Sequence, residues 1–224
     1  MGRVTVVFDN YKSDDRMQTG WGFAAYVEAN GRRVLFDTGP GMDPLRKNMA
    51  VLGLTSDDID SVVISHRHAD HAGGLGALPR RLQVIVPGKG GIGGGQRVVE
   101  NRGVQDLGGG MRAVLVGGVL PEQFLLAPGD ARTLILCGCA HPGVGKMVEA
   151  AAERAPGGKY LLMGGFHLSG APQDALAALS HRLRDLGVEA VAPCHCSGQE
   201  ARDAFSRFFG EGFISAAAGS VVEF

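Results

Sequence analysis

The 224-residue sequence predicts a layered fold that mixes strands and helices, of the α/β or α+β class. In the first half, short apolar runs rich in β-branched residues predict strands at about 3–8, 22–28, 33–37, 61–65 and 82–86. The second half alternates such runs with segments whose apolar residues recur at helical spacing. Because these helices are long enough to cover a sheet, the pattern favours two facing sheets with helices outside.

The helices are predicted from apolar spacing and from the residues at their ends. In the first half we expect a short helix near 44–52 and a further helical turn capped by Thr55. In the second half we expect helices around three apolar stripes, at 144–151, 176–186 and 201–208. Pro172 precedes the second stripe and Gly187 follows it, as at a helix start and end. Strands are expected at 133–137, 160–163 and 190–192, with a final strand pair starting at 213–216.

Composition and charge limit the classes of protein to which the chain can belong. Its length predicts one domain over residues 1–224. The formal net charge of −1 favours neither nucleic acid nor a membrane surface as a partner. No run approaches the roughly 20 apolar residues of a membrane span. The first residues predict a strand with no signal peptide in front of it, so we expect a cytoplasmic protein.

One short segment concentrates potential metal ligands directly after an expected buried strand. It reads His66-Arg67-His68-Ala69-Asp70-His71. Alternate side chains of an extended chain share a face, so His66 and His68 can bind one ion. Asp70 and His71 lie just beyond and can reach a second ion. Imidazoles with a carboxylate favour zinc, iron or manganese over calcium, and two adjacent ions are typical of hydrolytic centres.

The four cysteines form two Cys-x-Cys pairs, Cys137/Cys139 and Cys194/Cys196. This spacing differs from the Cys-x-x-Cys of structural zinc sites, so a zinc knuckle is not expected. A reducing compartment argues against disulfides. The thiols are either small buried residues at strand ends or, for Cys139 and Cys196, neighbours or ligands of a metal. Each of those two lies within two positions of a candidate ligand histidine.

These motifs together resemble those of a known family, the metallo-β-lactamase superfamily. The segment from His66 to His71 matches its metal-binding signature, and the resemblance extends over most of the chain. The other matching segments are Phe36-Asp37-Thr38-Gly39, Gly138-Cys139-Ala140-His141, Gly164-Gly165-Phe166-His167-Leu168 and Pro193-Cys194-His195-Cys196-Ser197-Gly198. The later segments are similar to the branch often labelled dihydropterin-methyl-ribofuranosylaminobenzene-phosphate synthase. The resemblance implies an αββα sandwich with metals at one edge.

The resemblance also implies a set of ligands and their roles. The first metal would be held by His66, His68 and His141, and the second by Asp70, His71 and His195. Zinc is expected first, with manganese or iron as alternatives. Asp70 would also accept a proton from the nucleophile. Asp37 would orient a ligand histidine from outside the metal's own ligand set.

One position departs from the pattern of the superfamily. Most hydrolytic relatives carry a bridging aspartate after a glycine on a later strand, where this chain has Gly165. We therefore expect the bridge to be absent, which leaves open whether one or two metals bind. His167 is a candidate ligand or proton donor to the leaving group, or else a structural residue.

Two segments are expected to select the substrate. Residues 9–20 and 88–110 are predicted loops, and the glycine-rich stretch from 88 to 97 is expected to be mobile near the site. That stretch lacks the Gly-Lys-Ser/Thr ending of a phosphate-binding loop. Lys89 is nevertheless a candidate contact for an anionic substrate. Asn10 either contacts substrate or simply ends the first strand in a turn.

The leading hypothesis is a metal-dependent hydrolase or transferase. It would use a metal-bound hydroxide or a metal-activated leaving group on a small phosphorylated or pyrophosphorylated molecule, a pterin condensation being one option. The alternatives are a di-iron redox protein and a non-catalytic metal-binding or sensor protein. Redox relatives usually carry glutamate where this chain has His68, and a sensor has no reason to keep all six ligands. Nucleic acid and membrane are not expected as partners, and the oligomeric state stays open.

Overall fold

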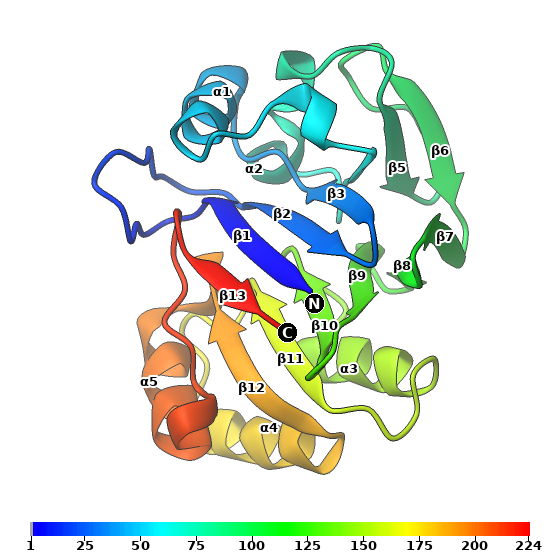
Figure 1. Ribbon diagram of the computed structural model, residues 1–224. Coiled ribbons are helices and arrows are strands. Elements are labelled where there is room, and N and C mark those ends of the chain that lie inside the picture. Colours follow the sequence, from blue (N-terminus) through cyan, green and yellow to red (C-terminus); the bar gives the residue numbers. More distant parts are fainter. Residues whose placement is uncertain (1) are drawn as a thin grey trace.

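Two β-sheets lie face to face in the computed structural model, which describes residues 2–224, and helices cover both outer sides (Figure 1). The predicted αββα sandwich is confirmed. The order along the chain explains the layers, because strands and helices of the first half build one sheet with its cover. The second half builds the other sheet, and only the last strand returns to the first.

The first sheet has seven strands, antiparallel on one side and parallel on the other. In spatial order they are β13 (Val221–Glu223), β1 (Arg3–Phe8), β2 (Ala24–Ala29), β3 (Arg32–Phe36), β4 (Ser61–Val63), β5 (Gln83–Pro87) and β6 (Arg97–Asn101). From β3 to β6 each strand runs parallel to the next. The carboxyl ends of these strands therefore meet at one edge of the sheet.

The second sheet has six strands and the same division into parallel and antiparallel parts. In spatial order they are β12 (Val188–Pro193), β11 (Tyr160–Gly164), β10 (Thr133–Cys137), β9 (Glu122–Pro128), β8 (Met111–Val116) and β7 (Val104–Gly108). The three strands β10, β11 and β12 are parallel. Their carboxyl ends also share an edge, so loops from both sheets can contribute to one site.

Helices divide between the two outer faces. Those on the first sheet are α1 (Met42–Val51) and α2 (Ala69–Ala72), with the 3₁₀ turns η1 (Ser56–Asp58) and η2 (Leu75–Ala77). Those on the second are α3 (Val144–Ala152), α4 (Gln173–Asp185) and α5 (Gln199–Phe209), with η3 (His195–Ser197) and η4 (Gly210–Gly212). Thr55 caps η1 with Asp58 in a capping box, as predicted. Within residues 2–224 none of the helices has the length and apolar character needed to cross a membrane.

Three apolar layers hold the sandwich together. The middle layer lies between the sheets and includes Phe36 and Met163. The outer layers lie under the helices and include Leu45 on one side and Phe205 on the other. All four side chains are at most 1% exposed, and each such burial stabilises the fold by roughly 1.5–3 kcal/mol. This framework supports the loops at its edge.

Most elements lie close to their predicted bounds, but two expectations are wrong. The segment 213–216 does not start a strand pair: Phe213 makes one isolated bridge to Val191, and β13 pairs with β1 alone. Residues 88–110 are not one loop, because β6 and β7 both lie within that range. Both are edge strands with half-exposed side chains, so their apolar alternation is too weak to stand out among the glycines.

Candidate metal centre

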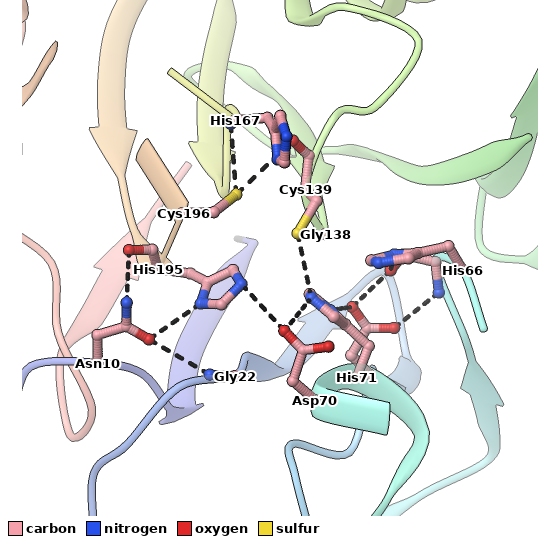
Figure 2. A network of polar contacts seen from close by, with 12 residues as sticks. Asn10, Gly22, His66, Asp70, His71, Gly138, Cys139, His167, His195 and Cys196 are labelled. Atoms are coloured by element: carbon pink, nitrogen blue, oxygen red, sulfur yellow. Dashed lines mark hydrogen bonds and ion pairs between the residues drawn. The ribbon is translucent and has the colours of Figure 1, made fainter. Parts of the chain in front are cut away.

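The predicted ligands lie in loops that follow the carboxyl ends of parallel strands. The segment from His66 to His71 follows β4 in the first sheet. His141, His167 and His195 follow β10, β11 and β12 in the second sheet. Figure 2 shows His66, Asp70 and His71 of the first sheet facing His167 and His195 of the second. The position agrees with the general tendency of ligand sites to form outside the carboxyl ends of strands.

The loops bring the ligand side chains into two adjacent groups. The first group consists of His66, His68 and His141. The second group consists of Asp70, His71 and His195. Within each group all ligand atoms lie within 4.8 Å of one another. The groups adjoin, since the ring centroids of His66 and His71 are 4.2 Å apart. These are the two triads that the family resemblance implied.

Four of the histidine rings are oriented through their Nδ1 atoms by oxygen atoms 2.7–3.0 Å away. The pairs are His66 with Ser65 Oγ, His71 with Asp37 Oδ2, His141 with Glu122 Oε2 and His195 with Asn10 Oδ1. An oxygen acceptor at Nδ1 places the proton there, so Nε2 keeps its lone pair. Ser65 fits this scheme because its hydroxyl donates to Asp37 and can then accept from His66.

Two of these Nε2 atoms are buried and make no hydrogen bond. They belong to His66 and His195, which are 0% and 3% exposed. A buried polar atom without a partner is costly unless something binds it. Burial also lowers the pKa of His66 to about 3 and of His71 to about 4, which keeps both rings in the neutral form that ligates metals. The donor set therefore fits a metal centre.

A buried glutamate, which the sequence did not single out, organises the first group. Glu122 begins β9, and its carboxylate accepts the backbone N–H groups of all four residues from 138 to 141, at 2.8–3.1 Å. Its Oε2 also lies 2.8 Å from His141 Nδ1. Burial opposes ionisation, but the bonds from His141 and the N–H groups outweigh it and lower the pKa of Glu122 to about 2. The available signal was the polar pair Glu122-Gln123 in an otherwise apolar strand.

Asp37 lies beneath the second group and contacts a ligand histidine. Its Oδ2 is 2.7 Å from His71 Nδ1, and its Oδ1 accepts the N–H of Ser65 at 2.7 Å. The residue is fully buried and has a left-handed φ of 58°. Burial raises the pKa of Asp37 to about 8, while the His66 ring and the two Ser65 hydrogen bonds oppose that rise by favouring the carboxylate.

Asn10 contacts His195 through both polar atoms of its side-chain amide. Its Nδ2 donates to the His195 carbonyl at 2.8 Å, while its Oδ1 lies 3.0 Å from His195 Nδ1 and accepts the N–H of Gly22 at 3.3 Å. The adjacent Asp9, which we did not predict as a site residue, accepts the His195 N–H at 2.6 Å. Burial raises the pKa of Asp9 to about 6. These contacts stabilise the left-handed φ of 44° at His195.

The two predicted catalytic residues lie on different sides of the centre. Asp70 Oδ2 is 3.6 Å from Nε2 of both His71 and His195. Although burial favours the neutral acid, the neighbouring His195 and His71 rings keep the pKa of Asp70 below its usual range. His167 is exposed, and its ring centroid lies 4.9 Å from that of His141. Its position at the rim of the first group suits either a ligand or a proton donor.

Gly165 has no room for a side chain. A Cβ atom there would lie 2.2 Å from the Gly138 carbonyl oxygen and 2.9 Å from Cys196 Sγ. An aspartate at this position would require both neighbours to move. Gly165 therefore has no space for the aspartate that the resemblance would place there, and a thiol occupies part of the space beside it.

The four cysteines are buried free thiols, in two different environments. Cys137 and Cys194 pack in the apolar layers. Cys139 Sγ lies 3.2 Å from His71 Nε2, and Cys196 Sγ accepts the N–H of His167 at 3.3 Å. In each Cys-x-Cys pair, therefore, the first thiol packs in a core layer and the second lies at the site.

The segment that carries Lys89 is fastened to the metal motif. Arg67 donates from its guanidinium to the carbonyl oxygens of Pro87, at 2.6 Å, and Gly90, at 2.8 Å. Lys89 itself is exposed, and its electrostatic partner in the structure is Glu100 of β6. The structure therefore places Lys89 on the β6 side of the segment and outside both ligand groups.

One exposed aromatic side chain, that of Trp21, lies beside the centre. Trp21 is 62% exposed, yet its ring centroid lies 4.8 Å from that of His195. Its position is set by its neighbours, because Gly22 donates its N–H to Asn10 and Phe23 donates its N–H to the Asp70 carbonyl. An exposed indole held next to a ligand histidine offers a flat surface to a bound molecule.

Comparisons with known proteins agree with this fold. Residues 22–93 match the family model of the metallo-beta-lactamase superfamily. The whole chain is similar to the crystal structure of Tm1679, a metal-dependent hydrolase of the beta-lactamase superfamily, with a TM-score of 0.83 and 25% identity over 100% of this chain and 99% of that one. The chain is thus similar to the metallo-β-lactamase superfamily, in sequence over residues 22–93 and in fold along its whole length.

Other similar proteins align with this chain over nearly their whole length. The 7,8-dihydropterin-6-methyl-4-(beta-D-ribofuranosyl)-aminobenzene-5'-phosphate synthase of Methanocaldococcus jannaschii is 25% identical and aligns with 97% of this chain and 94% of its own. YhfI from Bacillus subtilis shares the fold, with a TM-score of 0.70 and 14% identity over 100% of both chains. The superfamily resemblance seen in the motifs is confirmed along the whole chain.

Proposed function

We propose that this protein is a metal-dependent hydrolase or transferase of the metallo-β-lactamase superfamily acting on a small phosphorylated or pyrophosphorylated molecule. One observation carries the proposal, the pair of adjacent ligand groups. In these groups the Nδ1 contacts leave the lone pairs of the histidine Nε2 atoms available, and the Nε2 atoms of His66 and His195 are buried without a hydrogen bond. This arrangement is typical of centres that bind two metals side by side.

Two divalent ions are the cofactors that the donor set favours, zinc first and manganese or iron as alternatives. Such ions, when bound, would polarise a phosphoryl oxygen and lower the pKa of a coordinated water. We assign the first group to one ion and the second group to the other. Glu122, Asp37 and Asn10 would then hold the ligand rings in place.

The remaining polar groups supply proton transfer. Asp70 is partly exposed and keeps a low pKa, so its carboxylate can accept a proton from an attacking water at neutral pH. His167 lies on the solvent side of His141, where it can donate a proton to a departing oxygen. The two roles need opposite sides of the substrate, and Asp70 lies in the second group whereas His167 lies beside the first.

The exposed indole of Trp21 favours a substrate that contains a flat aromatic ring system. The indole lies beside His195, so a molecule whose phosphate reached the metals could stack its ring system on it. The M. jannaschii relative is named for a pterin compound, and we therefore place pterin pyrophosphate first among the substrates to test. We propose a small anionic molecule as the partner, a cytoplasmic location and one domain over the chain.

The proposal is tested by metal content and turnover on the same preparation. Protein purified without chelator is analysed for metals, then assayed on phosphomonoesters, phosphodiesters and pterin pyrophosphate with an arylamine. We expect bound metal, turnover of at least one of these substrates and its loss in His68→Ala. His181→Ala is the matched control, since His181 is exposed on α4 against Phe208. Full activity of His68→Ala would reject the proposal.

A further inference from the structure

The thiol of Cys139 lies among the histidines, between the two ligand groups. Its Sγ is within 4.8 Å of the ligand atoms of His66 and His71, and also of those of His195 and Cys196. It also belongs to a set with His141 and His167. Cys139 is therefore next to both groups, in the position that a bridging ligand would take.

The distance between Cys139 Sγ and His71 Nε2 suits two ligands of the same metal ion. Cys139 Sγ lies 3.2 Å from His71 Nε2, the nitrogen that the Asp37 contact leaves free. A tetrahedral zinc ion with bonds of about 2.0 Å to nitrogen and about 2.3 Å to sulfur holds such atoms about 3.5 Å apart. A shift of a few tenths of an ångström would therefore admit the ion between them.

The second group supplies three ligands and lacks the carboxylate that hydrolytic relatives usually add. Gly165 cannot carry that carboxylate, because the Gly138 backbone and Cys196 fill the space. His195 Nε2 provides an independent sign of a ligand at this place. The side chain is fully buried, and its Nε2 makes no hydrogen bond within residues 2–224. Zinc commonly takes four ligands, so one donor is needed in addition to Asp70, His71 and His195.

We propose that Cys139 is this fourth ligand, a thiolate that replaces the bridging carboxylate at the second metal. The inference rests on the proposed function in one respect, that the second group binds a metal. On binding, the Sγ–H bond breaks, its proton passes to solvent and a sulfur–metal bond forms. A thiolate among these donors selects zinc or iron over manganese.

Cys196 has a different role, that of a positioning residue. Figure 2 shows the Cys139 sulfur directed at His71 and the Cys196 sulfur directed at His167. Cys196 Sγ accepts the His167 N–H at 3.3 Å and lies 3.8 Å from the Cys139 carbonyl oxygen. It therefore links the loops that carry Cys139 and His167.

Cobalt substitution tests the inference without any assay of activity. Reduced protein with four free thiols, verified by mass after alkylation of the unfolded chain, is stripped of metal and titrated with Co²⁺. Wild type is expected to bind two equivalents and to show the near-ultraviolet charge-transfer absorption of sulfur bound to cobalt as the second site fills. Cys139→Ser is expected to lose this absorption and to bind the second equivalent at least tenfold more weakly.

The other three cysteines provide matched controls. Cys137→Ala and Cys194→Ala, which alter core thiols, and Cys196→Ser should all retain the absorption. Two bound equivalents without sulfur absorption in wild type, or an unchanged spectrum in Cys139→Ser, would overturn the inference and leave the proposed function standing. Absorption that disappears only in Cys196→Ser would also overturn it. Failure to bind any cobalt would instead count against the proposed function itself.

Discussion

The two ligand groups differ in how the chain holds them. In the first group one buried carboxylate, that of Glu122, fixes His141 and all four backbone N–H groups of the loop from 138 to 141. In the second group separate partners act on separate rings: Asp37 on His71 and Asn10 on His195. One loop is thus organised around a single charge, and the other ligands depend on several independent contacts.

This difference teaches which metal should be held more firmly. A ligand loop with all its N–H groups bound to one carboxylate has little freedom left to lose when a metal binds. The second group draws on segments far apart in sequence, from Asn10 to His195, and lacks the usual bridging carboxylate. We therefore expect the first metal to bind more tightly than the second.

Removing the charge of Glu122 should have the largest effect. Glu122→Gln leaves a buried amide facing four N–H donors and His141, so the free energy of unfolding should fall by about 3–5 kcal/mol. Metal affinity of the first group should fall as well, by about 10–100-fold. Urea unfolding of the metal-free protein measures the first effect, and a metal titration measures the second.

A surface glutamate provides the control for this variant. Glu153 is 74% exposed and pairs with Arg154 at 3.2 Å, so Glu153→Gln should change stability by less than about 1 kcal/mol. If Glu122→Gln unfolded at the same urea concentration as Glu153→Gln, the single-charge account of the first group would be wrong.

Chelation should separate the two metals in two steps. The second metal is expected to leave at a lower chelator concentration than the first. A ligand present at a hundredfold excess over its dissociation constant stabilises the folded state by about 3 kcal/mol, so each loss should lower the melting temperature by a measurable step. Scanning calorimetry with metal analysis at each chelator concentration checks this, and simultaneous loss of both ions would contradict the ranking.

Asn10→Ala should weaken only the second group. The variant removes the oxygen beside His195 Nδ1 and the bond to the His195 carbonyl, so the ring can rotate away from the metal. We expect a loss of about 10–100-fold in affinity for the second metal and none for the first. Isothermal titration resolves the two events. An equal loss at both sites would indicate a general effect on the fold.

The sequence predicted two facing sheets with helices outside because that fold depends on local patterns, whereas the ligand triads were implied by the family resemblance. The strand before His66 and the spacing of the motif are visible in a few residues, and the grouping followed from the family resemblance. The structure adds the partners of these residues, which come from distant segments. Glu122 lies 19 residues before His141 and Asp9 lies 186 before His195, so no local pattern joins either pair.

The packing contacts around these residues could not be predicted from the sequence either. The glycine at position 165 was recognisable as a departure, but only the packing of Gly138 and Cys196 gives its cause. The same holds for the Cys-x-Cys pairs, in which the chain turns between the two thiols. Cys137 remains in β10 and packs in a core layer, while Cys139 lies past the strand end and faces the site.

Trp21→Ala should have the smallest effect and should act on substrate binding alone. The exposed indole makes a ring contact with His195 but supplies no hydrogen bond to a ligand group in the structure, so metal content and stability should stay near wild type. Loss of stacking on an aromatic substrate costs about 1 kcal/mol, which raises KM about fivefold and leaves kcat nearly unchanged. Trp21→Phe, which keeps a ring, should recover most of this loss. A fall in kcat with unchanged KM would instead show that Trp21 acts through His195 and the second metal. Trp21 would then be one of the residues that position the second group.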